Sequence, residues 1–361
     1  MIFIQDYSQR NLQETDQLGS ARAKANVNIA LIKYWGKVDS EENLPAVGSL
    51  SLTLDEWGSE TRVTWYKSTV SDVAEHRFIL NGQERPDPKV NRLLDRLLEL
   101  AEQYDHAWAK PKQVWALVES MNTVPTASGL ASSASGMAAL GLAAWSSLAW
   151  ANPFDKTQAD QFSPACEHLI DLVRIGSGSA VRSLLGGLVR LERDGRRMKQ
   201  LQDAHEWSLA LVVAVVDPGP KAVSSREGME RTRQTSPYYQ AWVDSHEADL
   251  NAAEIAVKQK DLRCLGELME HSTFKMHSVM WASRPPLIFW NSATIACMQM
   301  IRKLQQEGLN VFFTIDAGPQ VKAICLKEDS NLVRKKFEEV SGVKQVMQSS
   351  LGAAVRLVES T

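Results

Sequence analysis

Lys33 and Lys37 come directly after a β-capable apolar run at Val27–Ile32. Two ammonium groups four residues apart, with Tyr34 and Gly36 between them, suit an extended anion such as a diphosphate, because each phosphate then has a cation of its own. The same pattern is also that of an ordinary strand end with two solvated lysines. The residues alone leave both interpretations open.

A turn rich in glycine and serine places an arginine in a pattern that can bind a carboxylate. From Arg174 to Gly187 the chain reads Arg-Ile-Gly-Ser-Gly-Ser-Ala-Val-Arg-Ser-Leu-Leu-Gly-Gly. Hydroxyl and backbone N–H groups can donate hydrogen bonds there, and the guanidinium of Arg182 can hold a carboxylate through two parallel hydrogen bonds. A plain turn with a surface arginine fits the pattern equally well.

Asp316 ends the apolar run Phe312–Ile315 and is followed by Ala-Gly-Pro. A carboxylate at a strand end can accept the proton of a substrate hydroxyl, which is a common use of aspartate in catalysis. An aspartate next to glycine and proline is also a frequent turn former. This residue too has a catalytic and a purely structural interpretation.

Small residues dominate Pro125–Gly136, which reads Pro-Thr-Ala-Ser-Gly-Leu-Ala-Ser-Ser-Ala-Ser-Gly, and the Ala- and Leu-rich stretch Met137–Trp150 after it predicts a helix. A Gly/Ser turn that opens a helix presents free N–H groups and the positive end of the helix dipole, so it can bind phosphates, and its serine hydroxyls can ligate Mg²⁺. No Gly-Lys-[Ser/Thr] of a Walker A loop follows. A tightly packed helix of small residues is the alternative.

Hydrophobic periodicity predicts the elements that must position these residues. Alternating or continuous apolar runs predict strands, and apolar residues spaced by three and four predict helices. In the first half the strands are predicted at Val27–Ile32, Ser49–Leu54, Thr61–Tyr66, Phe78–Leu80 (with a hairpin turn at Asn81-Gly82) and Val114–Glu119, and a helix at Val90–Tyr104.

The second half predicts a different layout. Its expected elements are a strand at Leu209–Val216, helices at 226–234, 247–270 and 287–308, strands at Asn310–Ile315 and Gln320–Leu326, a helix at 330–340 and a strand near 353–358. This order resembles a ferredoxin-like α+β layer. We therefore expect a polar N-terminal extension at 1–20, a first domain at 21–205 and a second domain at 206–361.

Composition excludes several classes of protein. Of 361 residues, 44% are hydrophobic and 23% charged, which is the balance of an ordinary globular protein, and the net charge of −3 argues against a nucleic-acid partner. The four cysteines form no Cys-x-x-Cys pair, so we expect reduced thiols in a reducing compartment. The seven histidines show no metal-binding pattern, and no Gly-x-Ser-x-Gly elbow of a serine hydrolase occurs.

Membrane insertion and secretion are not expected either. The N-terminus has no apolar run after a basic start, as a secretory signal would have. The stretch Met121–Phe154 contains no charge and is long enough to span a bilayer, but it carries Pro125, three glycines and many serines, where a span would be richer in Leu, Ile and Val.

The segment Pro125–Gly136 closely resembles the Pro-x-x-x-Gly-Leu-x-Ser-Ser-[Ala/Ser] loop of the GHMP kinase superfamily. Three further segments narrow the resemblance to the mevalonate diphosphate decarboxylases: Ile-Ala-x-x-Lys-Tyr-Trp-Gly-Lys ending at Lys37, Gly-Ser-Gly-Ser-Ala-x-Arg-Ser around Arg182, and Asp-Ala-Gly-Pro beginning at Asp316. The segment at Ser224–Met229 also resembles that family's substrate-phosphate loop. These motifs occur in the family's order from about Ala21 to the C-terminus.

This resemblance implies an α+β, two-lobed GHMP kinase fold, with a ribosomal protein S5 domain 2-like N-terminal lobe, a ferredoxin-like C-terminal lobe and the active site between them. It implies a cytoplasmic homodimer that uses ATP and Mg²⁺ to decarboxylate mevalonate 5-diphosphate to isopentenyl diphosphate.

The catalytic residues that the resemblance implies are Asp316 as base, Lys33 beside it, and Arg182 on the substrate carboxylate. The other substrate contacts it implies are Tyr34, Lys37, Ser177, Ser179, Ser225 and Arg226. The ATP contacts it implies are Ser128, Gly129, Leu130, Ala131, Ser132, Ser133 and Ser135, with Ser132 or Ser133 near Mg²⁺.

One departure from the family's pattern bears on the substrate. Many members carry polar residues after Asn-Leu-Pro, where this chain has Ala46-Val47-Gly48. Because this segment lines the cleft in the family, the choice of substrate stays open. The alternatives are decarboxylation of mevalonate 5-phosphate, a kinase that stops after phosphorylation, and a non-catalytic homologue.

Overall fold

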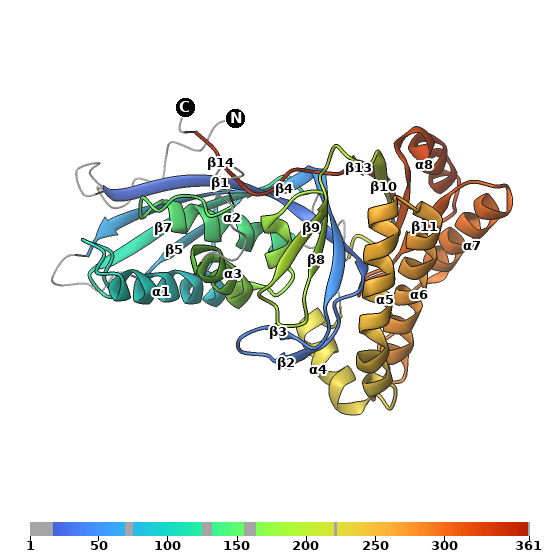
Figure 1. Ribbon diagram of the computed structural model, residues 1–361, viewed down its shortest axis with the longest axis horizontal. Coiled ribbons are helices and arrows are strands. Elements are labelled where there is room, and N and C mark those ends of the chain that lie inside the picture. Colours follow the sequence, from blue (N-terminus) through green and yellow to red (C-terminus); the bar gives the residue numbers. More distant parts are fainter. Residues whose placement is uncertain (1–16, 69–74, 125–131, 155–163, 220–221, 360–361) are drawn as a thin grey trace.

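The computed structural model describes residues 17–68, 75–124, 132–154, 164–219 and 222–359. Figure 1 shows an elongated molecule in which a strand-rich N-terminal lobe lies beside a C-terminal lobe of long helices and a smaller sheet. The first and last described strands lie side by side on the N-terminal lobe, since β14 (Arg356–Leu357) pairs with β1 (Gln17–Ile32) (Figure 1).

The N-terminal lobe is built on one sheet, with eight strands among the described residues, in the order β14-β1-β4-β7-β5-β6 plus β8 and β9 on the far part of β4. Its strands are β1 (Gln17–Ile32), β4 (Ser49–Lys67), β5 (Arg77–Leu80), β6 (Gln83–Glu84), β7 (Val114–Asn122), β8 (Leu188–Leu191), β9 (Met198–Gln202) and β14 (Arg356–Leu357). A separate ribbon pairs β2 (Lys37–Asp39) with β3 (Leu44–Pro45).

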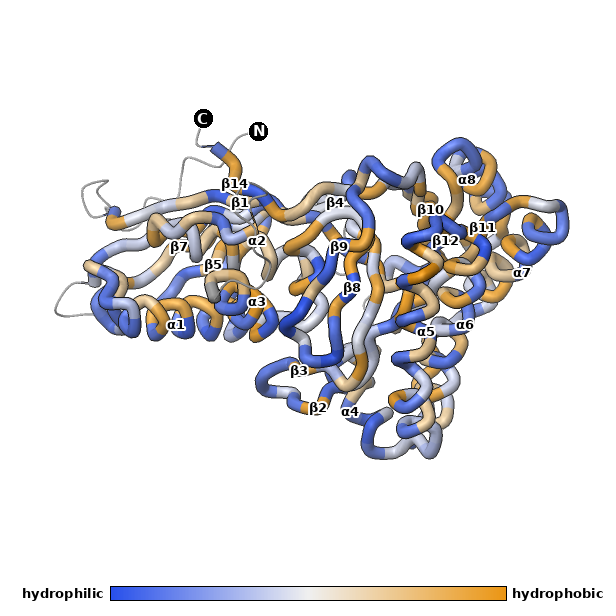
Figure 2. Tube along the Cα trace, viewed as in Figure 1, coloured by the Kyte–Doolittle hydropathy of each residue, from blue (hydrophilic) through white to orange (hydrophobic). Residues whose placement is uncertain are grey.

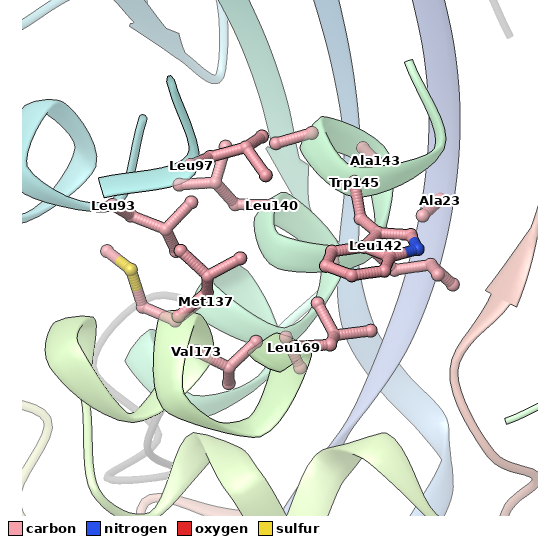
Figure 3. Packing of buried hydrophobic residues seen from close by; sticks show 14 of the residues in the cluster. Ala23, Leu93, Leu97, Met137, Leu140, Leu142, Ala143, Trp145, Leu169 and Val173 are labelled. Carbon is pink, nitrogen blue, oxygen red and sulfur yellow. The ribbon is translucent and has the colours of Figure 1, made fainter. Parts of the chain in front are cut away.

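The part of this lobe that the structure describes also holds three helices and one 3₁₀ turn: α1 (Pro88–Gln103), α2 (Ser132–Ser146), α3 (Pro164–Gly176) and η2 (Ala180–Leu184). Helix α2 is apolar on all sides, because it lies between the sheet and the other helices. Figure 3 shows its Met137 and Leu140 beside Leu93 of α1 and Val173 of α3. This burial explains the long uncharged stretch in the sequence.

Gly141 is required for the close approach of α2 and α3. A Cβ atom at Gly141 would lie 2.3 Å from Cγ2 of Val173, a distance at which one helix must move away. The helix that begins with Ser132 and Ser133 is therefore fixed from behind by α3.

The C-terminal lobe has a four-stranded antiparallel sheet in the order β11-β12-β10-β13. Its strands are β10 (Leu209–Val215), β11 (Val311–Thr314), β12 (Val321–Leu326) and β13 (Gln345–Ser350). Its helices are α4 (Ser225–Thr235), α5 (Tyr239–Gln259), α6 (Leu262–Trp281), α7 (Ser292–Gln306) and α8 (Ser330–Glu338), with the 3₁₀ turn η3 (Lys327–Asp329). The strand order confirms the predicted ferredoxin-like lobe.

Four predicted boundaries were wrong. The single helix expected at 247–270 is two helices, because Lys260 adopts a left-handed conformation (φ 54°) and Asp261 caps the next helix by accepting a hydrogen bond from the N–H of Cys264. The helix expected at 287–308 begins only at Ser292, where Asn291 forms a capping box with Thr294.

The last strand of the C-terminal sheet is β13 and not the segment near 353–358. Within that segment, Leu357 and Arg356 form β14, which pairs with Ala23 and Lys24 of β1 in the other lobe. The two strands expected at 49–54 and 61–66 form one continuous strand, β4. The hairpin turn expected at Asn81-Gly82 is confirmed, since both residues have positive φ angles of 51° and 78°.

The described part of the predicted N-terminal extension begins inside the sheet. Strand β1 starts at Gln17, and Gln17 pairs with Tyr66 of β4. Residues 1–16 lie outside the described residues. The boundary expected at 205 stays a prediction.

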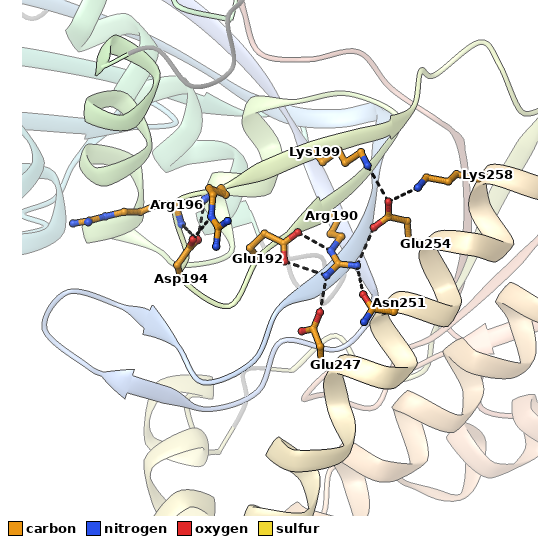
Figure 4. Close-up of polar contacts among 10 residues, drawn as sticks. Arg190, Glu192, Asp194, Arg196, Lys199, Glu247, Asn251, Glu254 and Lys258 are labelled. Atoms are coloured by element: carbon orange, nitrogen blue, oxygen red, sulfur yellow. Dashed lines mark hydrogen bonds and ion pairs between the residues drawn. The ribbon is translucent and has the colours of Figure 1, made fainter.

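The lobes share an apolar core and a buried ionic cluster. Figure 2 shows apolar residues along β4, β8 and α5, and Leu52 of β4 and Leu250 of α5 belong to one buried cluster. In the ionic cluster, Arg190 of β8 lies 2.7 Å from Glu247 and 2.9 Å from Glu254, both on α5 (Figure 4). The lobes are therefore fixed to one another along the side that holds the site.

Candidate active site

A pocket of about 480 Å³ lies between the two lobes. Residues from β1, the loop before β2, α2, η2, α4 and the segment after β11 meet there, although they are up to 289 positions apart (Asn28 to Ala317). Its polar lining includes Asn28, Lys33, Tyr34, Lys37, Asn43, Lys89, Ser132, Ser133, Ser177, Ser179, Arg182, Ser224, Ser225, Arg226 and Asp316.

Asp316 lies directly after β11 and is held by two lysines. One carboxylate oxygen (Oδ1) is 2.6 Å from Nζ of Lys33, and the other (Oδ2) is 2.8 Å from Nζ of Lys322. The two lysine side chains are each only 1% exposed, whereas that of Asp316 is 34% exposed, toward the pocket. The only acidic side chain in the described lining thus faces the pocket, with cations behind it.

These contacts set the protonation states of the group. Burial acts to raise the pKa of Asp316, but the ammonium groups of Lys322 and Lys33 outweigh it and hold that pKa far below its usual range. Burial lowers the pKa of Lys33 to about 8, against the opposing effect of Asp316. At neutral pH the carboxylate is therefore ionised.

Arg182 is buried on η2 and is fixed by two side chains. Its Nε donates to Oδ1 of Asn28 at 3.1 Å, and its Nη1 donates to Oγ of Ser49 at 2.9 Å. Its guanidinium carbon also lies 5.8 Å from the ring centre of Tyr34. Burial lowers the pKa of Arg182 to about 10, so it stays charged at neutral pH. A buried, oriented guanidinium that lines a pocket is suited to hold a carboxylate.

A second group of cations is organised by Asn43, whose backbone φ is +52°. Its side-chain oxygen accepts hydrogen bonds from Nζ of Lys37 and, at 3.3 Å, from Nη2 of Arg226. Its amide nitrogen donates to the carbonyls of Arg174 and Ile175 at 3.0 and 2.7 Å. One neutral amide therefore joins two cations from different lobes.

Tyr34 and Lys37 have altered acidities in this part of the pocket. The hydroxyl of Tyr34 donates to the carbonyl oxygen of Asn43 at 3.3 Å, and burial raises its pKa to about 12. Burial, together with the nearby charges of Arg226 and Lys89, lowers the pKa of Lys37 to about 8. Cations held close together without an internal carboxylate make a site for a multiply charged anion.

Two helix N-termini also open onto the pocket. Ser132 and Ser133 are the first residues of α2, and Ser225 is the first residue of α4. Ser224 caps α4 by accepting a hydrogen bond from the N–H of Glu227 at 3.2 Å. The free N–H groups and positive dipole ends of such helices favour phosphate groups.

Two models of one enzyme family match most of the chain. The diphosphomevalonate decarboxylase-like N-terminal domain matches residues 25–202, and the mevalonate 5-diphosphate decarboxylase C-terminal domain matches residues 211–359. The chain belongs to the mevalonate diphosphate decarboxylase family. Its two-lobed fold is accordingly the GHMP kinase fold that the sequence resemblance implied.

Individual relatives, by sequence and by structure, support the same family assignment. Diphosphomevalonate decarboxylase mvd1 of Aspergillus fumigatus is 32% identical over 89% of this chain and 80% of its own length, and the human diphosphomevalonate decarboxylase is 29% identical over 86% and 78%. The solved mevalonate diphosphate decarboxylase of Staphylococcus aureus has a TM-score of 0.80 at 32% identity, covering 94% of this chain and 98% of its own. A structure described as MDDEF in complex with MVAPP, AMPPCP and magnesium has a TM-score of 0.79 at 36% identity, over 95% and 99%.

In this decarboxylase family member, most of the predicted site residues come together. The eleven that line the pocket are Lys33, Tyr34, Lys37, Ser132, Ser133, Ser177, Ser179, Arg182, Ser225, Arg226 and Asp316. Ser135 does not join them. Its hydroxyl is fully buried against Ser59 at 2.8 Å and the carbonyl oxygen of Ser132 at 3.1 Å, so it holds the start of α2 to the sheet. Ser128, Gly129, Leu130 and Ala131 lie outside the described residues.

Sequence reasoning assigned no role to several residues in or behind the pocket, among them Lys322 and Asn43. Lys322 is a charged residue in the otherwise apolar strand β12, and that break in the strand pattern was the available signal. Asn43 precedes Leu44-Pro45, and its left-handed backbone is one that asparagine tolerates better than most residues. Its contacts with Lys37 and Arg226 depend on the fold and have no signature in the chain.

The departure at Ala46-Val47-Gly48 does not alter the pocket lining. Ala46 and Val47 are 3% and 2% exposed, and Val47 packs with Trp242 in a separate apolar cluster. A Cβ at Gly48 would lie 2.6 Å from Cδ2 of Leu250. The three residues therefore fit the segment beneath α5, and the substrate choice falls to the side chains that line the pocket.

The described residues offer neither a cluster of metal ligands nor a helix that could span a membrane. Within residues 17–359, apart from the stretches that the structure does not describe, no group of three or more His, Cys, Asp or Glu could hold a metal ion. Over the same residues, no helix combines the length and the apolar character needed to cross a bilayer. All four cysteines are free thiols, three of them buried.

Proposed function

We propose that this chain catalyses the ATP-dependent decarboxylation of mevalonate 5-diphosphate to isopentenyl diphosphate, with ADP, phosphate and CO₂ as the other products. The γ-phosphoryl group of ATP is transferred to the C3 hydroxyl, which forms a new P–O bond and breaks the bond to ADP. Phosphate then leaves C3 with its bonding electrons, and the C1–C2 electron pair forms the double bond as CO₂ departs.

The observation that carries this proposal is the ionised Asp316, which faces a pocket shared with Arg182 and the N-terminus of α2. A carboxylate with so low a pKa is a weak base, so it cannot remove the proton of a free tertiary alcohol. In a loose phosphoryl-transfer transition state the hydroxyl becomes acidic only as its new bond to phosphorus forms. Asp316 would therefore orient the hydroxyl first and accept its proton late.

The other lining residues divide between the two ends of the substrate. Arg182 would hold the C1 carboxylate, which must stay in place until the C3–O bond breaks. Ser177 and Ser179, whose hydroxyls are 3.1 Å apart, would add hydrogen bonds. Tyr34, Lys37, Ser225 and Arg226 would anchor the diphosphate. An anchored remote end supplies the positioning that makes a bimolecular step effectively unimolecular.

ATP would bind with its phosphates at the N-terminus of α2, where Ser132 and Ser133 line the pocket. The described site offers hydroxyls for Mg²⁺ but no cluster of carboxylates, which fits an ion that arrives with the nucleotide and keeps phosphate and water ligands. Such an ion would offset the negative charge of the phosphates. A related structure described as a complex with MVAPP, AMPPCP and magnesium supports this assignment.

The nearest alternative is a decarboxylase of mevalonate 5-phosphate. Three cationic side chains at one end of the pocket, Lys37, Lys89 and Arg226, favour the diphosphate, because it carries more charge than the monophosphate. A kinase that stops after phosphorylation is disfavoured, since Arg182 would then have no departing carboxylate to position. We further propose that the enzyme acts as a homodimer in the cytoplasm, which light scattering and cell fractionation would test.

The decisive experiment incubates the purified protein with ATP, Mg²⁺ and mevalonate 5-diphosphate, and follows ADP, phosphate and CO₂ together. We expect the three products in equal amounts, and mevalonate 5-phosphate as a poor substrate. Asp316→Asn should bind nucleotide yet lose turnover by about 10²–10⁴-fold, the usual contribution of a general base. ADP formation without CO₂ would point to the kinase, and near-normal turnover of Asp316→Asn would remove that residue from the mechanism.

A further inference from the structure

Lys322 is a lysine in the middle of an apolar strand face. In β12 it pairs with Val213 of β10 on one side and with Thr314 of β11 on the other. Because side chains alternate along a strand, Lys322 shares its face with Ile324, which belongs to the apolar core beneath. Its side chain is 1% exposed, so the ammonium group lies inside the protein.

Among the described residues, one side chain accepts a hydrogen bond from this ammonium. Nζ of Lys322 donates to Oδ2 of Asp316 at 2.8 Å. Lys322 does not line the pocket, whereas both Asp316 and its other partner, Lys33, do. Lys322 therefore acts on the pocket through Asp316, which it contacts, and at longer range through its charge beside Lys33.

A purely structural role does not explain a lysine at this position. Replacing a buried ion pair by apolar side chains of similar volume is often neutral or stabilising, because desolvating two charges costs about as much as their attraction returns. The neighbours in the sheet, such as Val213 and Ile324, show that the position suits a branched apolar residue. A lysine at this buried position is therefore best explained by the effect of its charge on the Asp316 carboxylate.

The two lysines of Asp316 come from different lobes. Lys33 follows β1 of the N-terminal lobe, whereas Lys322 lies six residues after Asp316 in the same C-terminal sheet. Lys322 therefore belongs to the same lobe as Asp316, whereas Lys33 reaches the carboxylate from the other lobe.

We propose that Lys322 is a positioning residue for the decarboxylation reaction: it fixes the orientation of the Asp316 carboxylate and keeps it ionised while Lys33 is free to interact with the bound substrates. The inference rests on the proposed role of Asp316 as the group that receives the hydroxyl proton. It assigns the two lysines different tasks, one at the reacting atoms and one behind the carboxylate.

Four titratable or charged groups surround Asp316. Lys33 and Lys322 contact it, Arg182 on η2 contributes at longer range, and His277 on α6 lies behind the loop, with Nε2 3.4 Å from the carbonyl oxygen of Ile315. Burial lowers the pKa of His277 to about 3, so it is neutral at working pH. Without Lys322, burial would raise the pKa of Asp316 with only Lys33 in contact to oppose it.

The test compares the pH dependence of kcat for the wild type and for Lys322→Met, with both substrates saturating. We expect the variant to lose about 10²-fold in kcat at neutral pH, the lower end of a general base's contribution. Its acid limb should move up by roughly 1–3 pH units, the effect of one adjacent cation on a carboxylate. KM for both substrates should stay within about threefold, since Lys322 touches neither.

Two control variants distinguish a positioning role of Lys322 from a contribution to the stability of the protein. Lys322→Arg keeps the cation and should restore part of kcat and return the acid limb toward its original position. Ile324→Ala removes a buried side chain from the same face of the same strand, so it should lower the melting temperature and leave the pH profile unchanged. If Lys322→Met does not fold, Lys322→Gln and the arginine variant carry the comparison.

The outcomes distinguish this inference from the proposed function. An unshifted acid limb in a folded Lys322→Met or Lys322→Gln enzyme, beside an inactive Asp316→Asn, would overturn the role of Lys322 alone. An active Asp316→Asn would instead overturn the role of Asp316. A wild type that releases no CO₂ would end the proposed reaction itself.

Discussion

The side-chain oxygen of Asn43 accepts a hydrogen bond from the ammonium group of Lys37, across the ribbon of β2 and β3. A neutral acceptor at this place orients the cation without cancelling its charge. An aspartate in the same position would neutralise Lys37 and repel an incoming phosphate. The anchoring end of the pocket therefore keeps its positive charge for the substrate.

Asn43→Gly should weaken binding of mevalonate 5-diphosphate. Glycine tolerates the positive φ of 52°, so the change removes the side chain and not the backbone conformation. Hydrogen bonds to charged groups contribute roughly 1.5–3 kcal/mol, which corresponds to a rise in KM of about 10- to 100-fold. Steady-state kinetics measures this change in KM. Asn81→Gly, at a second positive φ of 51° away from the pocket, should leave KM unchanged; an equal rise there would refute the assignment.

Substrate binding should weaken above a pH of about 8. The folded pKa of Lys37 is lowered to about 8, so this side chain is charged below that pH and neutral above it. KM for mevalonate 5-diphosphate should accordingly rise between pH 7 and about pH 9. Lys37→Arg should abolish this rise, because arginine stays charged there. A KM that stays flat in the wild type would contradict the prediction.

Arg182→Lys should impair turnover more than nucleotide binding. The guanidinium is fixed by Asn28 and Ser49 and offers a planar fork that an ammonium group cannot reproduce. We expect kcat/KM for the substrate to fall by roughly 10- to 1,000-fold, because the charge is kept but the paired hydrogen bonds of the guanidinium to the carboxylate are lost. ATP affinity, measured by nucleotide titration, should not change. Arg196→Lys on the surface is the control, and an equally active Arg182→Lys would remove the proposed carboxylate contact.

Arg190→Ala should destabilise the protein. Arg190 is buried to 6% exposure and contacts Glu192, Glu247 and Glu254, and its loss leaves these carboxylates facing one another (Figure 4). We expect about 2–4 kcal/mol less stability by urea denaturation, near the lower end for a broken buried pair because Glu247 reaches solvent. Arg334→Ala, whose partner Glu338 is exposed, should cost under about 1 kcal/mol. Similar losses of stability in both variants would show that the burial of the arginine does not determine the size of the loss.

Much of the fold could be predicted because its signals are local. The buried strand β10 and the hairpin turn at Asn81-Gly82 follow from apolar runs and turn residues that need no partner to be recognised. Helix α3 was not predicted, although its apolar residues Leu169, Ile170 and Val173 are spaced as in a helix. The short strand β14 has no pattern of its own and exists only because β1 offers it an edge.

The site residues also divide into those that a local motif predicts and those that only the folded structure identifies. Lys33, Arg182 and Asp316 stand in motifs, and the fold brings them to one pocket as expected. No role could be assigned to Lys322 from the sequence, because that role depends on one contact in the folded protein, the hydrogen bond to Oδ2 of Asp316. Ser135 shows the opposite error, since it belongs to the motif by sequence and to the packing of α2 on the sheet by position.

The pairing of β14 with β1 has a consequence for how the protein is made. Ala23 and Lys24 are translated near the beginning of the chain, whereas Arg356 and Leu357 come near its end. That part of the β1 edge therefore stays open during synthesis, and the first sheet is completed only after the ribosome has delivered almost the entire second lobe. An exposed strand edge is a template for unwanted association, so a nascent chain stalled before Arg356 should be more prone to aggregate than the finished protein.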